Sequence, residues 1–99
     1  KWEAKALVGE IVHADRFGNL ISNLTSQHLE EVYVAAKRRQ PLIRVGERFI
    51  EGLMNSYSEG TAGEVSALIN SDGRLEIFVK EASAADFLQM RRGGRIEVS

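Results

Sequence analysis

The sequence predicts a mostly β fold, a small antiparallel barrel or sandwich with one or two short helices. Many short segments rich in β-branched and aromatic residues follow one another, separated by turn residues. Asp72-Gly73, between two alternating segments, is a signal for a tight hairpin of type I′. Because the chain has 99 residues and 43% of them are hydrophobic, we expect a single domain over residues 1–99.

Strands are predicted where β-branched and polar residues alternate between turn residues. Gly9 marks a bulge or a close approach within the first strand. The predicted strands cover residues 6–14, 42–45, 48–52, 64–70, 74–80 and 95–98, with a return strand beginning at Leu20-Ile21. In segment 74–80 the inward positions are expected at Leu75, Ile77 and Val79, and the outward ones at Arg74, Glu76 and Lys80, with Phe78 as the exception.

Capping patterns predict two short helices. Thr25-Ser26 offers a side-chain oxygen that can cap a helix running through Glu31, and a strand is expected over Val32–Ala36. Ser83-Ala84-Ala85-Asp86 resembles a capping box, which predicts a second helix to about Met90.

The overall charge argues against binding of nucleic acid. The net charge is −1, so bulk electrostatics would not attract a polyanion. The basic stretches Lys37-Arg38-Arg39 and Arg91-Arg92 are short and lack interleaved aromatic residues. We therefore expect a solvated turn and a helix end at these two places.

Disulfides, thiolate metal sites, membrane spans and signal peptides are excluded by features that the sequence lacks. Without cysteine, neither disulfides nor thiolate metal sites are available. No apolar run approaches the roughly 20 residues of a membrane span, and no signal-peptide pattern opens the chain. We therefore expect a cytoplasmic protein without membrane contact. Since the chain starts at Lys1 and not at Met, we also expect it to be a domain of a longer protein, or else a processed product.

The segment Asp15-Arg16-Phe17-Gly18-Asn19-Leu20-Ile21-Ser22-Asn23, after the first predicted strand, has the composition of a binding loop. It holds a carboxylate, an aromatic ring, a glycine and two carboxamides. A tight turn needs Gly, Asn or Asp for its backbone. It does not need Phe17, nor a second Asn after three more residues. We therefore expect this loop to face a small polar and aromatic ligand.

Further motifs accompany this loop in a fixed order. They are Gly9-Glu10-Ile11-Val12 leading into the loop, then Asn55-Ser56-Tyr57-Ser58-Glu59-Gly60, Asn70-Ser71-Asp72-Gly73-Arg74-Leu75-Glu76-Ile77 and Ala82-Ser83-Ala84-Ala85. In these motifs, which are spread over residues 9–85, the chain resembles the C-terminal β-barrel domain of the S-adenosyl-L-methionine (SAM) hydroxide adenosyltransferases. These adenosine-forming SAM hydrolases are related to the SAM-dependent fluorinase and chlorinase enzymes. The resemblance implies a small antiparallel β-barrel.

The resemblance also implies an enzyme in which hydroxide attacks the ribose C5′ of SAM and methionine leaves. It implies a homotrimer, with each site between the N-terminal domain of one subunit and the barrel of its neighbour. The water-activating residues of the family belong to that N-terminal domain. This chain is therefore expected to contribute substrate binding, with no catalytic residue, no metal and no cofactor, and neither His13 nor His28 is expected to replace them.

Four residues of the chain are assigned to the substrate by the resemblance. Asp15 would accept a charge-assisted hydrogen bond from the methionine ammonium, and Asn19 would bind the amino-acid head group. For both, a turn residue is the alternative. Phe17 would pack on the methionine chain or on adenine, or else plug the end of the barrel. Tyr57 would stack on adenine, or else be an amphipathic surface residue.

Further assignments concern the second hairpin and the residues after it. Ser71 would donate its hydroxyl to the methionine carboxylate, or else belong to the hairpin turn. Main-chain groups of Val79 to Ala82 would contact adenine, and Asn23 is expected to be structural. The halogenating relatives tend to carry Arg and Trp where this chain has Asp72 and Ile21, which favours hydroxide as the nucleophile.

Two other functions remain open from the sequence. The chain could be a stand-alone barrel module that binds a nucleoside or an oligonucleotide. It could instead be a structural domain that holds the subunits of a trimer together. As a substrate-binding domain by itself, it is expected to be inactive and to bind SAM weakly or not at all, because half of the pocket walls would be missing.

Overall fold

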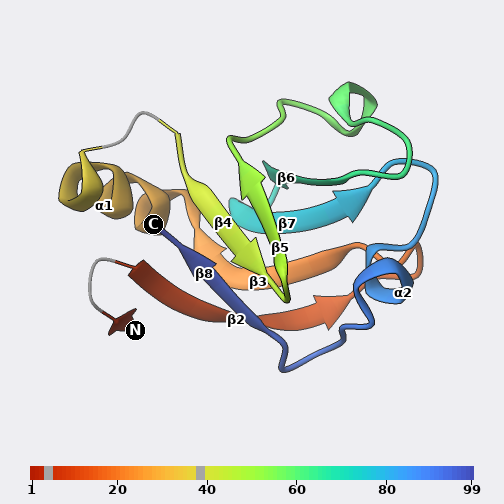
Figure 1. Ribbon diagram of the computed structural model, residues 1–99, viewed down its shortest axis with the longest axis horizontal. Helices are drawn as coiled ribbons and strands as arrows, with labels where there is room; N and C mark the ends of the chain where they lie inside the picture. The colour runs from red at the N-terminus through yellow and green to blue at the C-terminus, as the bar shows by residue number, and fades with distance from the viewer. Residues whose placement is uncertain (4–5, 38–39) are drawn as a thin grey trace.

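The computed structural model confirms a mostly β, nearly closed antiparallel barrel with two short helices (Figure 1). It describes residues 1–3, 6–37 and 40–99. The strands are β1 (Trp2–Glu3), β2 (Ala6–Ala14), β3 (Leu20–Thr25), β4 (Leu42–Val45), β5 (Arg48–Glu51), β6 (Val65–Ile69), β7 (Arg74–Val79) and β8 (Arg95–Val98). The helices are α1 (Ser26–Ala36) and α2 (Ala84–Leu88), and a single 3-10 turn, η1, covers Tyr57–Glu59.

The barrel strands follow the order β5-β4-β8-β2-β3-β7-β6, and every neighbouring pair is antiparallel. Strand β1 pairs with the start of β2 outside this path. An isolated bridge between Met54, which follows β5, and Leu68 of β6 links the two ends of the order. The described strands therefore wrap around one core and almost close on themselves.

Strand β2 passes through both halves of the barrel. Its first part pairs with β8 and its last part with β3, and the register shifts between Ile11 and His13. Gly9 lies just before this shift, where a Cβ atom would be 2.5 Å from Asn23 Oδ1. The predicted close approach is confirmed. Asn23 is structural here, because Glu10 N donates to its Oδ1 at 2.9 Å.

Inward-facing residues of successive strands form the core in rows that the register dictates. One row runs across the sheet from Ile50 through Ile43 and Val98 to Leu7, all buried. In the other half, Ile77 of β7 lies between its cross-strand partners on β3 and β6. This alternation is what the sequence pattern predicts for strands with one buried face.

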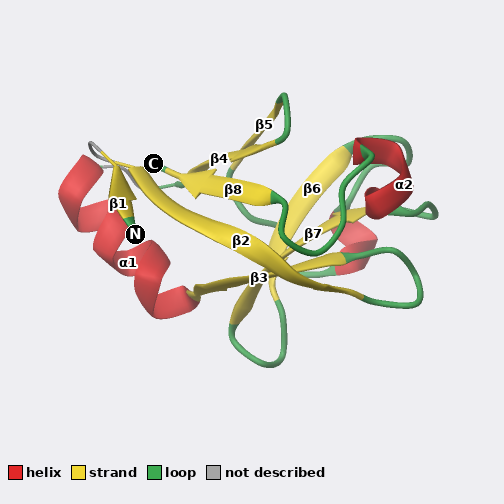
Figure 2. Ribbon diagram, turned by 90° about the horizontal axis from the view of Figure 1, so that it is seen from below, coloured by secondary structure: helices red, strands yellow, loops and turns green. Residues whose placement is uncertain are grey.

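Helix α1 covers one end of the barrel, and α2 lies at the other end (Figures 1 and 2). Thr25 caps α1: His28 N donates to its hydroxyl at 3.3 Å, while Thr25 N donates to His28 Nδ1 at 3.0 Å. The expected strand over Val32–Ala36 is wrong, because α1 continues through these residues. Leu29 and Val32, three residues apart, are both buried. Core packing of this face outweighs the strand propensity of the β-branched residues.

Two details near the predicted turns also differ. Asn70 C=O accepts from Gly73 N, and only Gly73 of this turn has a positive φ, so the hairpin uses a three-residue turn with a glycine bulge and not type I′. Helix α2 ends at Leu88, earlier than expected, because Gln89 adopts the left-handed conformation. Of the predicted basic turn, Arg38 and Arg39 lie outside the described residues.

Neither of the described helices is long and apolar enough to cross a membrane.

Candidate functional site

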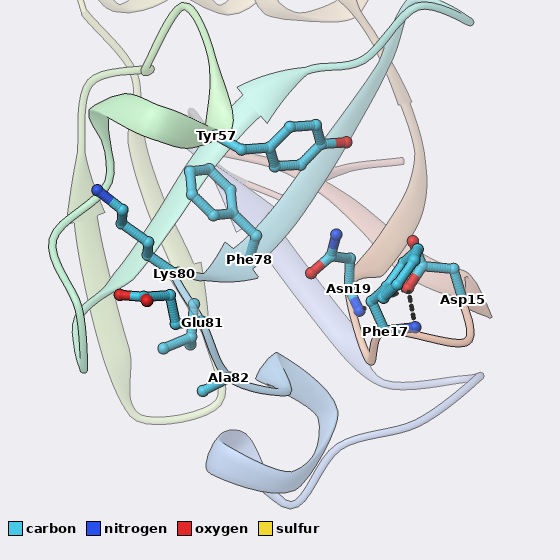
Figure 3. Close-up of a pocket in the computed structure, with 9 residues that line it drawn as sticks. Asp15, Phe17, Asn19, Tyr57, Phe78, Lys80, Glu81 and Ala82 are labelled. Atoms are coloured by element: carbon cyan, nitrogen blue, oxygen red, sulfur yellow. Dashed lines mark hydrogen bonds between the residues drawn. The ribbon is translucent and has the colours of Figure 1, made fainter.

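A pocket of about 600 Å³ opens at the α2 end of the barrel (Figure 3). This volume lies within the range of ordinary small-molecule sites. The β2–β3 loop forms one side, η1 and the outer face of β7 form another, and the segment after β7 completes it. The residues that line it are Asp15, Phe17, Asn19, Tyr57, Phe78, Val79, Lys80, Glu81 and Ala82.

The two oxygens of the Asp15 carboxylate differ in their hydrogen-bond partners. Its Oδ1 accepts hydrogen bonds from Phe17 N at 2.9 Å and from Asn19 N at 3.0 Å, which closes the β2–β3 loop. Its Oδ2 has no hydrogen-bond partner within the described part of the chain. The turn role and the ligand role of Asp15 are therefore compatible, because each uses one oxygen.

Gly18 lets the β2–β3 loop lie directly on the start of α2. Its C=O accepts from Ala85 N at 2.8 Å, and its φ is +84°. A Cβ atom at this position would overlap the hydroxyl of Ser83 and lie 2.9 Å from Ser83 Cα. Ser83 cannot move away freely, since its hydroxyl caps α2 by accepting from Asp86 N. A glycine is required here for both conformation and space.

Tyr57 and Phe78 form an aromatic wall of the pocket. Their ring centroids are 5.2 Å apart with an interplanar angle of 73°, an edge-to-face arrangement. Phe78 is 1% exposed although it lies outside the barrel core, because the segment around η1 covers it. Gly60 permits this covering, as a Cβ atom there would be 2.7 Å from Phe78 Cε2.

Part of the pocket rim is apolar and open. Phe17 is 65% exposed and Tyr57 is 47% exposed. The guanidinium of Arg16 lies 5.0 Å from the centre of the Phe17 ring, in cation–π geometry. These rings leave flat apolar surface available to a ligand or to another protein surface.

Glu76 does not face solvent as the strand alternation predicted. It is 3% exposed, and its Oε2 accepts from the Tyr57 hydroxyl at 2.5 Å. The outer face of β7 is covered by the chain around Tyr57, which local sequence pattern does not reveal. Burial, together with this hydrogen bond and the charge of Glu76, raises the pKa of Tyr57 to about 12.

Ionisation of Tyr57 is expected to destabilise the fold in alkaline solution. Its folded pKa of about 12 lies above the ordinary value of 10.0, so the unfolded chain loses the phenolic proton first. The resulting stabilisation is fully present below about pH 10 and is lost as the pH rises through about 12. Urea denaturation across this range should show a steeper loss for the wild type than for Tyr57→Phe. Equal pH dependence of the two proteins would contradict the buried contact.

The segment after β7 forms a tight turn at the pocket. Ala82 N donates to Val79 C=O at 3.1 Å. Glu81 has a φ of +62°, which is uncommon for a residue with a side chain. Lys80 Nζ donates to the C=O of Ser58 at 3.2 Å and so ties this turn to η1. The main-chain groups of this turn are thereby held at fixed positions along the pocket wall.

The structure brings together six of the seven residues predicted from the sequence and separates the seventh. Asp15, Phe17, Asn19, Tyr57, Val79 and Ala82 all line the pocket. Ser71 does not; it lies exposed in the turn between β6 and β7, whereas the pocket adjoins the other end of β7.

Sequence reasoning missed Phe78 and included Lys80 and Glu81 only through the main chain of Val79 to Ala82. Phe78, Lys80 and Glu81 also line the pocket. For Phe78 a signal was present, since a large apolar residue interrupts the polar positions of its strand face. No local pattern indicates the side chains of Lys80 or Glu81.

The fold and the pocket define a class of small antiparallel barrel domains with an aromatic-walled, half-open pocket at one end. The chain belongs to the family of SAM hydroxide adenosyltransferase C-terminal domains, whose family model matches residues 9–97. A comparison with curated proteins gives no match.

Two solved structures share this fold. One is an uncharacterized conserved protein from Thermotoga maritima, with 24% identity and a TM-score of 0.76. The other is a conserved hypothetical protein from Thermus thermophilus, with 25% identity and a TM-score of 0.75. The matches cover 98% and 97% of this chain, but only 37% and 36% of those two chains.

Proposed function

We propose that this domain holds the substrate of a SAM hydrolase, which converts SAM and water to adenosine and methionine. The observation that carries the proposal is the pocket itself: a carboxylate oxygen without a partner among the described residues lies across from an aromatic wall, in a chain of this family. SAM presents an amino-acid head with an ammonium group at one end and a flat base at the other. Such a ligand matches both sides of the pocket.

Each side of the pocket has a separate task in this proposal. Asp15 Oδ2 accepts a hydrogen bond from the ammonium of the methionine part, and the adjacent carboxamide of Asn19 binds the same head group. The adenine base packs on the Tyr57 ring, with the main chain of Val79 to Ala82 along its edge. Holding both ends orients C5′ of the ribose for attack by hydroxide.

The water-activating groups would come from outside this chain. We propose that the exposed rim at Phe17 and Tyr57 meets an N-terminal domain of a neighbouring subunit in a homotrimer, which completes the pocket. The share of the two relatives that the chain spans, a little over a third, supports a longer enzyme. The domain alone is then inactive and binds SAM weakly.

Asp15→Asn separates the two roles of this residue. The asparagine retains an acceptor for the amides of Phe17 and Asn19 but removes the negative charge. In the longer enzyme that we propose, kcat/KM for SAM should fall about ten- to a hundredfold, mainly through KM, as expected for a lost charge-assisted hydrogen bond. The measurement is steady-state release of adenosine.

Asp72→Asn is the matched control, because Asp72 is exposed in the β6–β7 turn and does not line the pocket. It should leave the kinetics unchanged. Binding of adenosine, which has no ammonium group, should be the same for Asp15→Asn and the wild type. If SAM kinetics survive Asp15→Asn, then Asp15 does not bind the head group.

A stand-alone nucleoside-binding module is the second candidate, and the exposed aromatic surface of Phe17 and Tyr57 favours it. Titration of the isolated chain with adenosine and with SAM, followed by amide NMR shifts, separates the candidates. A substrate-binding domain should give dissociation constants in the millimolar range or weaker. Micromolar binding of adenosine by the isolated chain would favour the module.

A further inference from the structure

We propose that Glu76 is a positioning residue of the pocket, which fixes the ring of Tyr57 so that the ring, and not the hydroxyl, contacts a ligand. This inference rests on the proposed function only for the nature of the ligand. The geometry behind it involves the side chains of Glu76, Asn70, Tyr57 and Phe78 and the turn between β6 and β7.

The first observation is that Glu76 is buried without a cation. It is 3% exposed, and the ion pairs within the described residues do not include it. Its two oxygens accept from neutral donors, Oε2 from the Tyr57 hydroxyl at 2.5 Å and Oε1 from Asn70 Nδ2 at 3.0 Å. A buried carboxylate is costly unless its hydrogen bonds are complete. An apolar residue would serve the barrel better, so the carboxylate indicates a task at the pocket.

The second observation is that Asn70 can present only its amide nitrogen to Glu76. Its Oδ1 accepts from Asp72 N and from Arg74 N, both at 3.0 Å, inside the β6–β7 turn. The turn therefore orients Asn70, Asn70 orients Glu76, and Glu76 orients the Tyr57 hydroxyl. Although Ser71 lies outside the pocket, its turn is connected to the pocket wall through this chain of hydrogen bonds.

The third observation concerns which part of the Tyr57 side chain is available to a ligand. Its hydroxyl is occupied by Glu76, and its ring meets Phe78 edge to face at 5.2 Å. The Tyr57 ring is thus held at two places, on a segment that has no barrel strand of its own. A fixed ring whose hydroxyl proton is already donated selects a flat aromatic group and offers no hydrogen-bond donor to it.

Glu76→Gln tests the inference, because glutamine has only one acceptor oxygen. If its oxygen accepts from Asn70, its amide nitrogen faces Tyr57, so a neutral, reversed hydrogen bond replaces the charge-assisted one that the Tyr57 hydroxyl donates to Glu76. Aromatic NMR of the 99-residue chain should then show much weaker cross-relaxation between the Tyr57 and Phe78 rings at a temperature where the variant is folded. Glu64→Gln, the same change in the exposed loop before β6, should leave this signal at its wild-type level.

Binding supplies a readout that a purely structural role would not change. With adenosine as the probe, the concentration for half-maximal shift of the Lys80 to Ala82 amides should rise about fivefold in Glu76→Gln. In a Tyr57→Phe background, where no hydroxyl remains to be positioned, Glu76→Gln should add little. An equal fivefold rise in that background, or ring contacts unchanged in both Glu76→Gln and Tyr57→Phe, would overturn the inference.

Failure of the proposed function has a different signature. If Asp15→Asn leaves the SAM kinetics of the longer enzyme unchanged, the assignment of the pocket to SAM is weakened, while the ring contacts still decide the role of Glu76. Should Glu76→Gln fail to fold, Tyr57→Phe removes the same hydrogen bond from the other side. Its ring should then lose order against Phe78, and a ring as ordered as in the wild type would overturn the inference.

Discussion

Gly18→Ala is expected to lower the free energy of unfolding by about 2–5 kcal/mol, the sum of a left-handed backbone penalty and an overpacking penalty. The φ of Gly18 is +84°, and an added methyl group would overlap the Ser83 side chain. To relieve the clash, the β2–β3 loop must separate from α2 and lose the hydrogen bond from Ala85 N. Since this loop carries Asp15 and Asn19, the pocket should be lost together with stability. Urea denaturation and the amide spectrum of the loop measure both effects.

Gly63→Ala is the matched control for this prediction. Gly63 also has a positive φ, +81°, but nothing lies within 4 Å of an added Cβ atom. Only the backbone penalty of about 1–2 kcal/mol applies there. If the two variants lost equal stability, the contact between the loop and α2 would not be the cause.

Phe78→Ala is expected to lower the free energy of unfolding by about 3–5 kcal/mol, the usual cost of removing a buried aromatic side chain. Phe78 is 1% exposed, and its ring packs edge to face against the Tyr57 ring in the pocket wall. Without it, the segment around Gly60 loses the surface on which it packs. Differential scanning calorimetry should show a much lower melting temperature, and the Tyr57 ring should become mobile.

Phe49→Ala controls for loss of a phenylalanine ring as such. Phe49 is 63% exposed on β5 and does not line the pocket, so its removal should cost less than about 1 kcal/mol. If Phe78→Ala cost as little stability as Phe49→Ala, the segment around η1 would not bury Phe78.

The strands were predictable because each one needs only a local pattern. The predicted limits of β2, β4 and β8 agree with the structure, since alternation and flanking turn residues mark them directly. Helix α1 was mispredicted beyond Glu31. There, β-branched residues locally favour a strand, whereas burial of Val32 against the barrel depends on residues that are distant in sequence.

The same distinction applies to the pocket. The β2–β3 loop was identified from its unusual composition, because carboxylate, carboxamide and aromatic groups lie within five residues. Ser71 was placed with the pocket from the resemblance alone, and the position of its turn at the opposite end of β7 follows from the length of that strand.

The sequence by itself determined the mostly β fold, most of its strands and the chemistry of the loop that begins at Asp15, because these depend on periodicity and on residue type. Only the tertiary structure decided that Glu76 is buried beneath Tyr57, 19 residues away in the chain. An outward position on a strand is exposed unless another segment covers it, and that covering is a non-local contact. The pocket therefore combines a wall that the sequence predicts with a wall that only folding assembles.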